Sequence, residues 1–377
     1  MRGRLAPSPT GALHLGGAAT FLVAWLDARS SGSRLVLRIE DLDLPRVVPG
    51  AEAGILQDLR WLGLDWDEGP EEGGPWGPYR QSERVAFYEE ALNKLKARGL
   101  VYGCDCSRTE IARVASAPHT GEEGTRYPGT CRSKGLQGPW RRPPALRFAV
   151  PEGKEVRFMD ELHGERREVV SRSVGDFVLQ RGDGVIAYQL AVVVDDLAMK
   201  IERVIRGADL LDSTARQVLL LEALEGEPPS YLHTPMVLGS NGMRLAKRSR
   251  GVPVADQRQA GRSPEEVVGA LACMLGLRDV ATPCTAASLL SDYEPTRLSK
   301  EAVLLPEALR VLLEPLGIVR SIPRPITDGE LYVPPMQAYH RRKPHPVSSR
   351  WRHLEEGRAA SPRHLHRTTW ATSTWSC

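Results

Sequence analysis

Two stretches, far apart in the 377-residue sequence, combine residue types that suit the binding of phosphate groups. The first is APSPTGALHLGG, residues 6–17, which follows a short strand-like run and precedes a helical pattern from Ala18. This order predicts a strand, a tight turn and a helix N-terminus, where glycine lets the backbone approach a ligand and free N–H groups attract phosphate. We therefore predict a nucleotide-phosphate site that includes His14, Gly16 and Gly17. A plain glycine-rich loop is the alternative interpretation.

The second stretch is GSNGMRLAKRSRG, residues 239–251, which is bounded by glycines and clusters Arg244, Lys247 and Arg248. Cationic side chains on a loop can stabilise the charge that develops on a transferring phosphoryl group. In isolation the same residues are also typical of a solvated basic turn.

Three of the six cysteines form a third group, in CDC at residues 104–106 and YPGTC at residues 127–131. Three thiolates close together in a Gly- and Pro-rich segment suit tetrahedral zinc, which takes four protein ligands in structural sites. Tyr127 or His119 could supply the fourth ligand, and the alternative is three free thiols beside a core tyrosine. We interpret Cys273, Cys284 and Cys377 as structural or incidental, because they have no clustered partners in the sequence.

The elements that must position these residues follow an alternating pattern over residues 1–100. A strand is predicted over residues 34–43, and helices over residues 51–67 and 82–100. Strands alternating with helices favour a parallel α/β sheet. Residues 101–150 interrupt this pattern and are interpreted as an insertion.

Further along, apolar runs predict strands over residues 155–200, with a hairpin turn at residues 182–184. Residues 201–225 predict a short strand followed by an amphipathic helix, and residues 264–277 predict one more helix. We divide the chain into a first catalytic half, a zinc-binding insertion, a second catalytic half, a loop with a short helical region, and an atypical, disordered basic tail: 1–100, 101–150, 151–238, 239–280 and 281–377.

Bulk composition restricts the class of protein. The net charge is +3, but residues 320–377 contain ten Lys and Arg against four Asp and Glu, a balance of +6. The body of the chain is therefore mildly acidic and the tail basic. The sequence has no run of about 18 apolar residues and no apolar signal core, so we expect a cytoplasmic protein that is not embedded in a membrane. In that compartment cysteines favour thiols or metal over disulfides.

The two phosphate-binding stretches together resemble the paired signatures of the class I aminoacyl-tRNA synthetases. HLGG, residues 14–17, is similar to their His-x-Gly-His-type motif, and RLAKR, residues 244–248, to their Lys-Met-Ser-Lys-Ser-type loop. Arg244 stands where the first lysine is usual and Ala246 where the serine is usual. Across residues 1–275, four longer stretches resemble the glutamyl branch in the same order: RLAPSPTGALHLGG, RIEDLD, AYQLAVVVDD and IRGADLLDSTARQ.

The resemblance implies a Rossmann-type, doubly wound parallel sheet and an enzyme that activates L-glutamate with ATP and Mg²⁺. It implies a glutamate pocket in which Arg4 and Ser8 hold the substrate and Glu40 meets its ammonium group. It implies His14, Arg244 and Lys247 as the catalytic residues. The full sets are Arg4, Leu5, Ala6, Pro7, Ser8, Glu40, Tyr188 and Arg206 for glutamate, and His14, Gly16, Gly17 and Lys247 for ATP.

The cysteine spacing C-x-C…Y-x-x-x-C is similar to the zinc site of a family of shortened paralogues, the glutamyl-queuosine tRNA(Asp) synthetases. The resemblance implies a single structural zinc ion bound by Cys104, Cys106, Tyr127 and Cys131. It also implies a monomer that forms glutamyl-adenylate without tRNA and then glutamylates the queuosine base in the anticodon stem-loop of tRNA(Asp). Two alternatives are a truncated glutamyl-tRNA synthetase that charges tRNA(Glu), and a catalytically inactive paralogue that only binds RNA.

Overall fold

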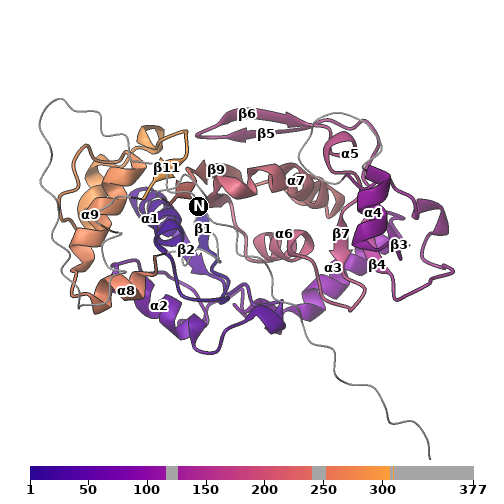
Figure 1. Cartoon of the computed structure of the whole chain (residues 1–377), viewed down its shortest axis with the longest axis horizontal. Helices are drawn as coiled ribbons and strands as arrows, with labels where there is room; N and C mark the ends of the chain where they lie inside the picture. Colours follow the sequence, from indigo (N-terminus) through magenta and orange to yellow (C-terminus); the bar gives the residue numbers. More distant parts are fainter. Residues whose placement is uncertain (116–125, 240–251, 306–308, 310–377) are drawn as a thin grey trace, which may run out of the picture. The chain divides into compact units, whose positions relative to one another are not determined.

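The computed structural model describes residues 1–115, 126–239, 252–305 and 309 (Figure 1). The basic stretch around Lys247, residue His119 and most of the predicted tail lie outside these residues. None of the described helices has the length and apolar character needed to cross a bilayer. The described helices are α1 (Leu15–Ser30), α2 (Ala51–Trp61), α3 (Val85–Ala97), α4 (Arg108–Ala115), α5 (Val170–Ser173), α6 (Tyr188–Ala198), α7 (Thr214–Ala223), α8 (Val254–Gln259) and α9 (Pro264–Leu275).

The strands pair in both directions. Strands β1 and β2 are parallel, as are β8 and β9, whereas β5 and β6 form an antiparallel hairpin beside β9. A second, antiparallel sheet has the order β3-β4-β7. The predicted α/β class is confirmed, but the sheets are mixed rather than wholly parallel. The strand bounds are β1 (Arg2–Leu5), β2 (Arg34–Leu37), β3 (Val101–Cys104), β4 (Ala145–Phe148), β5 (Val156–Asp160), β6 (Gly164–Glu168), β7 (Val178–Gln180), β8 (Arg203–Gly207), β9 (Ser230–Thr234), β10 (Val237–Leu238) and β11 (Val303–Leu304).

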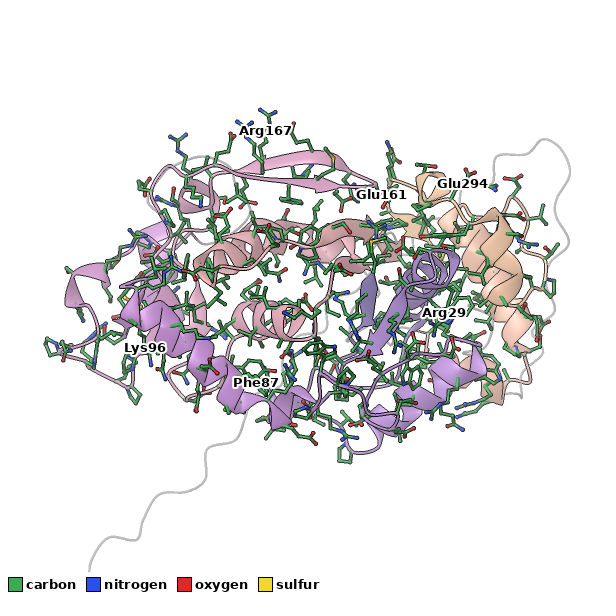
Figure 2. All side chains as sticks on the ribbon, turned by 180° about the vertical axis from the view of Figure 1, so that it is seen from behind. Arg29, Phe87, Lys96, Glu161, Arg167 and Glu294 are labelled. Atoms are coloured by element: carbon green, nitrogen blue, oxygen red, sulfur yellow. The ribbon has the colours of Figure 1, made fainter. Side chains whose placement is uncertain are left out.

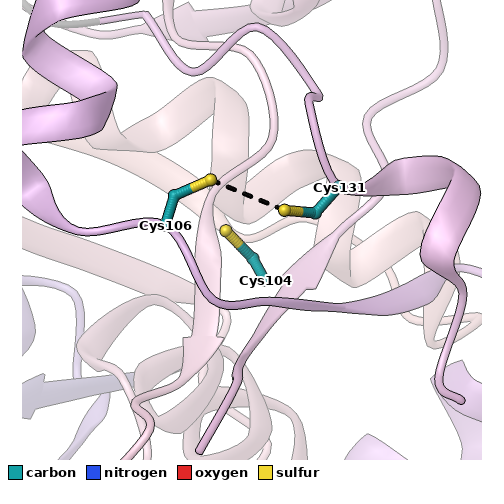
Figure 3. Close-up of side chains that lie close together, drawn as sticks. All are labelled: Cys104, Cys106 and Cys131. Carbon is teal, nitrogen blue, oxygen red and sulfur yellow. Dashed lines mark hydrogen bonds between the residues drawn. The ribbon is translucent and has the colours of Figure 1, made fainter. Parts of the chain in front are cut away.

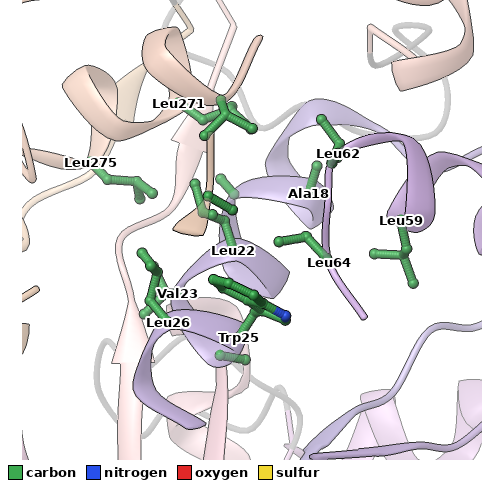
Figure 4. Packing of buried hydrophobic residues seen from close by; sticks show 14 of the residues in the cluster. Ala18, Leu22, Val23, Trp25, Leu26, Leu59, Leu62, Leu64, Leu271 and Leu275 are labelled. Atoms are coloured by element: carbon green, nitrogen blue, oxygen red, sulfur yellow. The ribbon is translucent and has the colours of Figure 1, made fainter. Parts of the chain in front are cut away.

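Helix α1 is the centre of the first hydrophobic cluster. It contacts β1, β2 and β8 on one side and α9 on another (Figure 1). Its apolar residues are not confined to one stripe, which is typical of a helix buried on most faces. Figure 4 shows Leu22 and Trp25 of α1 meeting Leu271 of α9 and Leu62 and Leu64 after α2.

A second hydrophobic cluster joins α3, α6 and α7 to the strands between them. Many charged side chains lie on the surface, as Arg167 of β6 and Glu294 illustrate by pointing away from the ribbon (Figure 2). The ends of β1, β2 and β8 border a cavity, and most of the predicted glutamate residues line it.

Residues 188–198 were predicted as strand and are instead helix α6. The run LAVVVDD is short, apolar and rich in β-branched valine, so its pattern does not distinguish a buried strand from a buried helix. Leu190 to Val194 are all in the second hydrophobic cluster, and such burial is compatible with either structure. The helix places Tyr188 at its first turn and Asp195 and Asp196 at its last.

Residues 281–305 also differ from the prediction of a tail without regular structure. They contain the short 3-10 helices η5 (Ala287–Asp292) and η6 (Pro295–Arg297) and strand β11. Leu289, Leu298 and Leu305 are buried in the cluster around α1. The segment has no apolar periodicity because its irregular backbone contributes isolated leucines, so no periodic pattern marks it in the sequence. The other predicted segment boundaries stay predictions.

We predict that Gly269→Ala in α9 destabilises the protein. An added Cβ would lie 2.1 Å from the carbonyl oxygen of Thr282 and 2.8 Å from its carbonyl carbon. Because these are backbone atoms that cannot rotate away, the free energy of unfolding should fall by roughly 1–3 kcal/mol, measured by urea denaturation.

The matched control is Gly54→Ala in α2, where an added Cβ meets no heavy atom within 4 Å. Alanine is the better helix former, so this change should leave stability unchanged or raise it by up to about 1 kcal/mol. Equal stability of the two variants would contradict the close packing of residue 282 on α9.

Candidate functional site

A cavity of about 470 Å³ lies where the ends of β1, β2 and β8 meet the N-termini of α1 and α6. The structure brings together here most of the residues predicted for glutamate and ATP. They come from segments that are up to about 200 positions apart, so only the fold makes them neighbours. The predicted residues that line this cavity are Arg4, Ala6, His14, Gly16, Gly17, Glu40, Tyr188 and Arg206.

Arg206 on β8 is 5% exposed and makes three hydrogen bonds with its guanidinium. Its Nε donates to Nε2 of His233 at 3.0 Å, its Nη1 to Oε1 of Gln217 at 2.7 Å, and its Nη2 to Oγ1 of Thr214 at 2.9 Å. All three acceptors are uncharged groups, since His233 is neutral for reasons given below. No carboxylate of the described residues lies within ion-pair distance of Arg206. A guanidinium has five N–H donors, so one N–H on each Nη is left for a ligand.

Arg4 on β1 is the second buried cation of the cavity. Its Nη1 donates to the carbonyl oxygen of Ile205 at 2.7 Å, and its Nε lies 3.8 Å from Oδ1 of Asp196. Burial lowers the pKa of Arg4, and the neighbouring Arg38 and Arg206 guanidiniums act in the same direction against Asp196. Cations that are crowded and poorly hydrated in this way favour an anionic ligand.

Glu40, which follows β2, is the acid that lines the cavity nearest these cations. Its Oε1 accepts a hydrogen bond from Nη2 of Arg38 at 3.2 Å. Burial raises the pKa of Glu40 above its usual range, although Arg38 and Arg4 oppose this shift. A ligand ammonium beside Glu40 would favour the ionised carboxylate.

A buried ion-pair network contacts Glu40 through Arg38 and Arg4 through Asp196. Arg38 donates to Oδ1 of Asp196 at 2.7 Å and lies 3.7 Å from Oδ2 of Asp195. Asp195 in turn accepts from Nε of Arg84 at 2.6 Å. Sequence reasoning did not assign these residues a role. One signal was available: Asp195 and Asp196 directly follow an apolar run, and two adjacent acids inside a core are unusual.

His14 is the N-cap of α1, with Nδ1 accepting a hydrogen bond from the backbone N–H of Gly17 at 3.0 Å. The first turn of α1 contains no acidic residue, so the positive end of the helix dipole is open to an anion. A Cβ on Gly16 would lie 3.2 Å from Nδ1 of His14, so glycine keeps this turn compact.

The chain returns to this helix N-terminus directly after the basic stretch. The backbone N–H of Leu15 donates to the carbonyl oxygen of Val252, and that of Val254 to the carbonyl oxygen of Leu13. Arg244 and Lys247 themselves lie outside the described residues, so their roles stay predictions.

Three predicted glutamate residues do not line this cavity. The side chain of Leu5 is fully buried in the hydrophobic cluster around α1, and Pro7 is buried as well. Ser8 lines a neighbouring cavity of about 320 Å³, which shares Glu40 and Tyr188 with the first. Leu5 and Pro7 contribute through the backbone instead, because their carbonyl oxygens accept hydrogen bonds from the N–H groups of Arg38 and Glu40.

The three cysteines at 104, 106 and 131 meet at the end of β3 (Figure 3). Their sulfur atoms all lie within 4.8 Å of one another, and those of Cys106 and Cys131 are 3.5 Å apart. The hydroxyl oxygen of Tyr127 lies 3.2 Å from the sulfur of Cys104 and 3.9 Å from that of Cys106. Sulfurs bound to tetrahedral zinc at about 2.3 Å lie about 3.8 Å apart, so this donor set fits the ion.

Electrostatics around the cluster distinguish its members. Burial opposes ionisation of Cys104, but hydrogen bonds with Tyr127, with the backbone of Cys106 and with Arg147 bring the pKa of its thiol below the usual range. Burial and the neighbouring Cys131 and Cys104 raise the pKa of Cys106 to about 12. The Arg147 guanidinium lies 3.8 Å from the centre of the Tyr127 ring. A divalent cation would favour the thiolates by compensating the charge that they acquire.

Comparisons with known proteins agree with this geometry. The family described as tRNA synthetases class I (E and Q), catalytic domain, matches residues 1–301. The glutamyl-Q tRNA(Asp) synthetase of Symbiobacterium thermophilum is 50% identical over 310 residues, which cover 81% of this chain and 95% of that protein. The glutamyl-Q tRNA(Asp) synthetase of Nitratidesulfovibrio vulgaris is 49% identical over 282 residues, which cover 74% of this chain and 87% of that protein. The crystal structure of a glutamate-tRNA synthetase from Elizabethkingia anophelis matches with a TM-score of 0.70 at 29% identity, covering 82% of this chain and 68% of that one.

We predict that Cys104→Ser removes bound zinc and lowers stability. The change replaces a thiolate by a weakly coordinating hydroxyl while preserving size, so the remaining donors bind the ion less tightly. Zinc per chain, measured by elemental mass spectrometry after gel filtration, should fall, and the midpoint of thermal unfolding should fall with it. The matched control is Cys284→Ser, which changes a buried cysteine outside the cluster. Full zinc content in Cys104→Ser would exclude this cluster as a four-ligand site.

Proposed function

Because this chain belongs to the class I tRNA synthetase family of the E and Q group, we propose that it glutamylates the queuosine base of tRNA(Asp). It is a ligase-type enzyme. In the proposed reaction it first forms glutamyl-adenylate from L-glutamate and ATP without tRNA. It then transfers the glutamyl group to the anticodon stem-loop.

The observation that carries the proposal is the buried Arg206 guanidinium, which the described residues supply with neutral acceptors only. A buried charge without a counter-ion is costly, and a planar guanidinium with one free N–H on each Nη suits a carboxylate in bidentate geometry. Arg4 supplies a second cation and Glu40 an anion. L-Glutamate has two carboxylates and one ammonium, which complement these three groups; the exposed Asp209 also lines the cavity.

The proposed first step is attack by a carboxylate oxygen of glutamate on the α-phosphorus of ATP. An acyl–phosphate bond forms, and the bond between the α-phosphorus and the bridging oxygen breaks to release pyrophosphate. This chemistry needs positioning and charge stabilisation more than a covalent catalyst. His14, Gly16 and Gly17 at the start of α1 would hold the phosphates. Arg244 and Lys247 would stabilise the leaving pyrophosphate, and Mg²⁺ would enter with ATP.

In the proposed second step a hydroxyl of the queuosine cyclopentene-diol attacks the glutamyl carbonyl carbon, an ester forms and AMP leaves. The 50% identity to the Symbiobacterium glutamyl-Q tRNA(Asp) synthetase, against 42% to a glutamate-tRNA ligase of Halorhodospira halophila, supports this acceptor over the acceptor end of tRNA(Glu). The proposed enzyme is a cytoplasmic monomer.

The proposed metal is one structural zinc ion held by Cys104, Cys106, Tyr127 and Cys131. Four protein ligands leave no open coordination position, so the ion would fix the loops around β3 rather than take part in the reaction. The support is the donor geometry of the cluster.

The deciding experiment supplies radiolabelled glutamate and ATP to two purified RNAs, tRNA(Asp) containing queuosine and tRNA(Glu). We expect label on the first only, removed by mild base as an ester would be. Label on tRNA(Glu) only would make the chain a minimal glutamyl-tRNA synthetase. Absence of label on both RNAs, together with absence of ATP–pyrophosphate exchange, would indicate an inactive RNA-binding paralogue.

We predict that Arg206→Gln raises the KM for glutamate by at least about tenfold, since it removes a charge-assisted hydrogen-bonding partner. The KM for ATP should change little, because the predicted phosphate contacts lie at α1. Pyrophosphate exchange measures both constants. The matched control is Arg203→Gln on the same strand, where the arginine pairs with Asp27 outside the cavity. An unchanged KM for glutamate in Arg206→Gln would remove Arg206 from the glutamate site.

A further inference from the structure

A chain of three buried side chains lies behind the cavity and ends at Arg206. Asp160 closes β5, His233 lies on the neighbouring β9, and Arg206 lies on β8. Oδ2 of Asp160 is 2.7 Å from Nδ1 of His233, and Nε2 of His233 accepts from Nε of Arg206 at 3.0 Å. Asp160 and His233 are both 0% exposed. Neither residue touches the cavity, so their chemistry reaches it only through Arg206.

The hydrogen bonds fix one tautomer of His233. The pKa of Asp160 is lowered despite its burial, because His233 and the backbone N–H of His163 donate to it, so it is an ionised acceptor. Nδ1 of His233 must therefore carry the proton that faces Asp160. In a neutral imidazole the other nitrogen, Nε2, then has a lone pair, and this lone pair accepts from Arg206. Burial lowers the pKa of His233, and Arg206 adds to that effect, which keeps the ring neutral.

We propose that Asp160 and His233 are positioning residues that orient the Arg206 guanidinium toward the cavity by holding His233 in this tautomer. The inference rests on the proposed function, in which Arg206 binds a carboxylate of glutamate. With its Nε held by His233 and one N–H of each Nη bonded to Gln217 and Thr214, the guanidinium has a fixed orientation, and one N–H on each Nη is left for a ligand. If Nε2 of His233 carried a proton, it would present a donor to Arg206, and the guanidinium would lose this anchor.

The surroundings of His233 give the arrangement a pH dependence of known sign. Besides Asp160 and Arg206, the groups that face it are the Thr214 hydroxyl at 3.3 Å, the stacked Tyr231 ring, and His163, whose Nε2 is 3.1 Å from the His233 carbonyl oxygen. Its carboxylate neighbour, Asp160, is already balanced by four N–H groups: those of Leu162 and His163, and the backbone and ring of His233. Protonating His233 would place a second cation against Arg206. Glutamate binding should therefore weaken as the pH falls below the ordinary histidine pKa of about 6.5.

The test measures the KM values for glutamate and for ATP by pyrophosphate exchange between about pH 5.5 and 8. In the native protein the KM for glutamate should rise toward low pH, while the KM for ATP stays nearly constant. His233→Phe, which removes the acceptor, should raise the KM for glutamate at neutral pH by roughly tenfold. His233→Gln places an amide oxygen near the position of Nε2 and should recover most of that loss, with a flatter pH profile because the amide does not titrate.

Asp160→Asn tests the tautomer without changing the ring. An asparagine amide can donate to Nδ1, which shifts the ring proton to Nε2, so the KM for glutamate should rise while the KM for ATP does not. His163→Gln is the matched control, because it changes the adjacent histidine but leaves the contact of His233 with Arg206. Thermal unfolding and zinc content report whether each variant is folded. If His233→Phe does not fold, the pH profiles of the native protein and of His233→Gln still decide the question.

The outcomes separate this inference from the proposed function. If Arg206→Gln raises the KM for glutamate but the native profile is flat and Asp160→Asn behaves like the native protein, the positioning role is overturned and the glutamate site stands. If Arg206→Gln leaves the KM for glutamate unchanged, the proposed function itself fails. A rise confined to glutamate in Arg206→Gln, His233→Phe and Asp160→Asn, with recovery in His233→Gln, supports both.

Discussion

The buried ion-pair network around Arg38 is the constraint on which the rest of the structure depends. Arg38 follows β2, is fully buried, and reaches Asp195 and Asp196 at the end of α6. Removing one member of a buried pair leaves an uncompensated charge, which costs far more than the pair contributes when it is intact. The network therefore allows only a narrow range of positions for α6 relative to β2. Arg84, bonded to the same Asp195, places α3 by the same interaction.

This network also decides which charges remain available to a ligand. Asp196 is shared between Arg38 and Arg4, so its carboxylate is already paired with arginines that join β1 and β2 to α6. Among the described residues, Arg206 is supplied with the neutral groups of His233, Gln217 and Thr214. The cavity consequently has buried cations on β1 and β8 and an acid, Glu40, on the segment that follows β2. Arg4 and Glu40 therefore belong both to the ion-pair network and to the wall of the cavity, whereas Arg206 lines the cavity without an ion pair to the other described residues.

Local patterns were sufficient to predict the parts of the site that are local. The turn at His14, Gly16 and Gly17 follows from glycine chemistry at a helix start, and three cysteines within 28 positions suggest a metal by proximity alone. The contact between Asp160 and His233 spans 73 positions and follows from strand pairing, so no window of sequence contains its signal. Helix α6 was missed for a related reason, because valine-rich runs obtain their structure from what surrounds them. The burial of leucines in residues 281–305 was not predicted, because isolated leucines in an irregular segment produce no periodic pattern.

Arg206 has no ion-pair partner in the part of the chain that the structure describes, so a ligand that supplies one links folding to ligand binding. A ligand that binds only the native state adds RT ln(1 + [L]/Kd) to the free energy of unfolding. If glutamate supplies the missing carboxylate, the amino acid acts as part of the folded core while it is bound. The ligand-free protein then contains an electrostatic defect that its substrate repairs. The thermal stability of the protein, and with it the lifetime, would then depend on the concentration of glutamate.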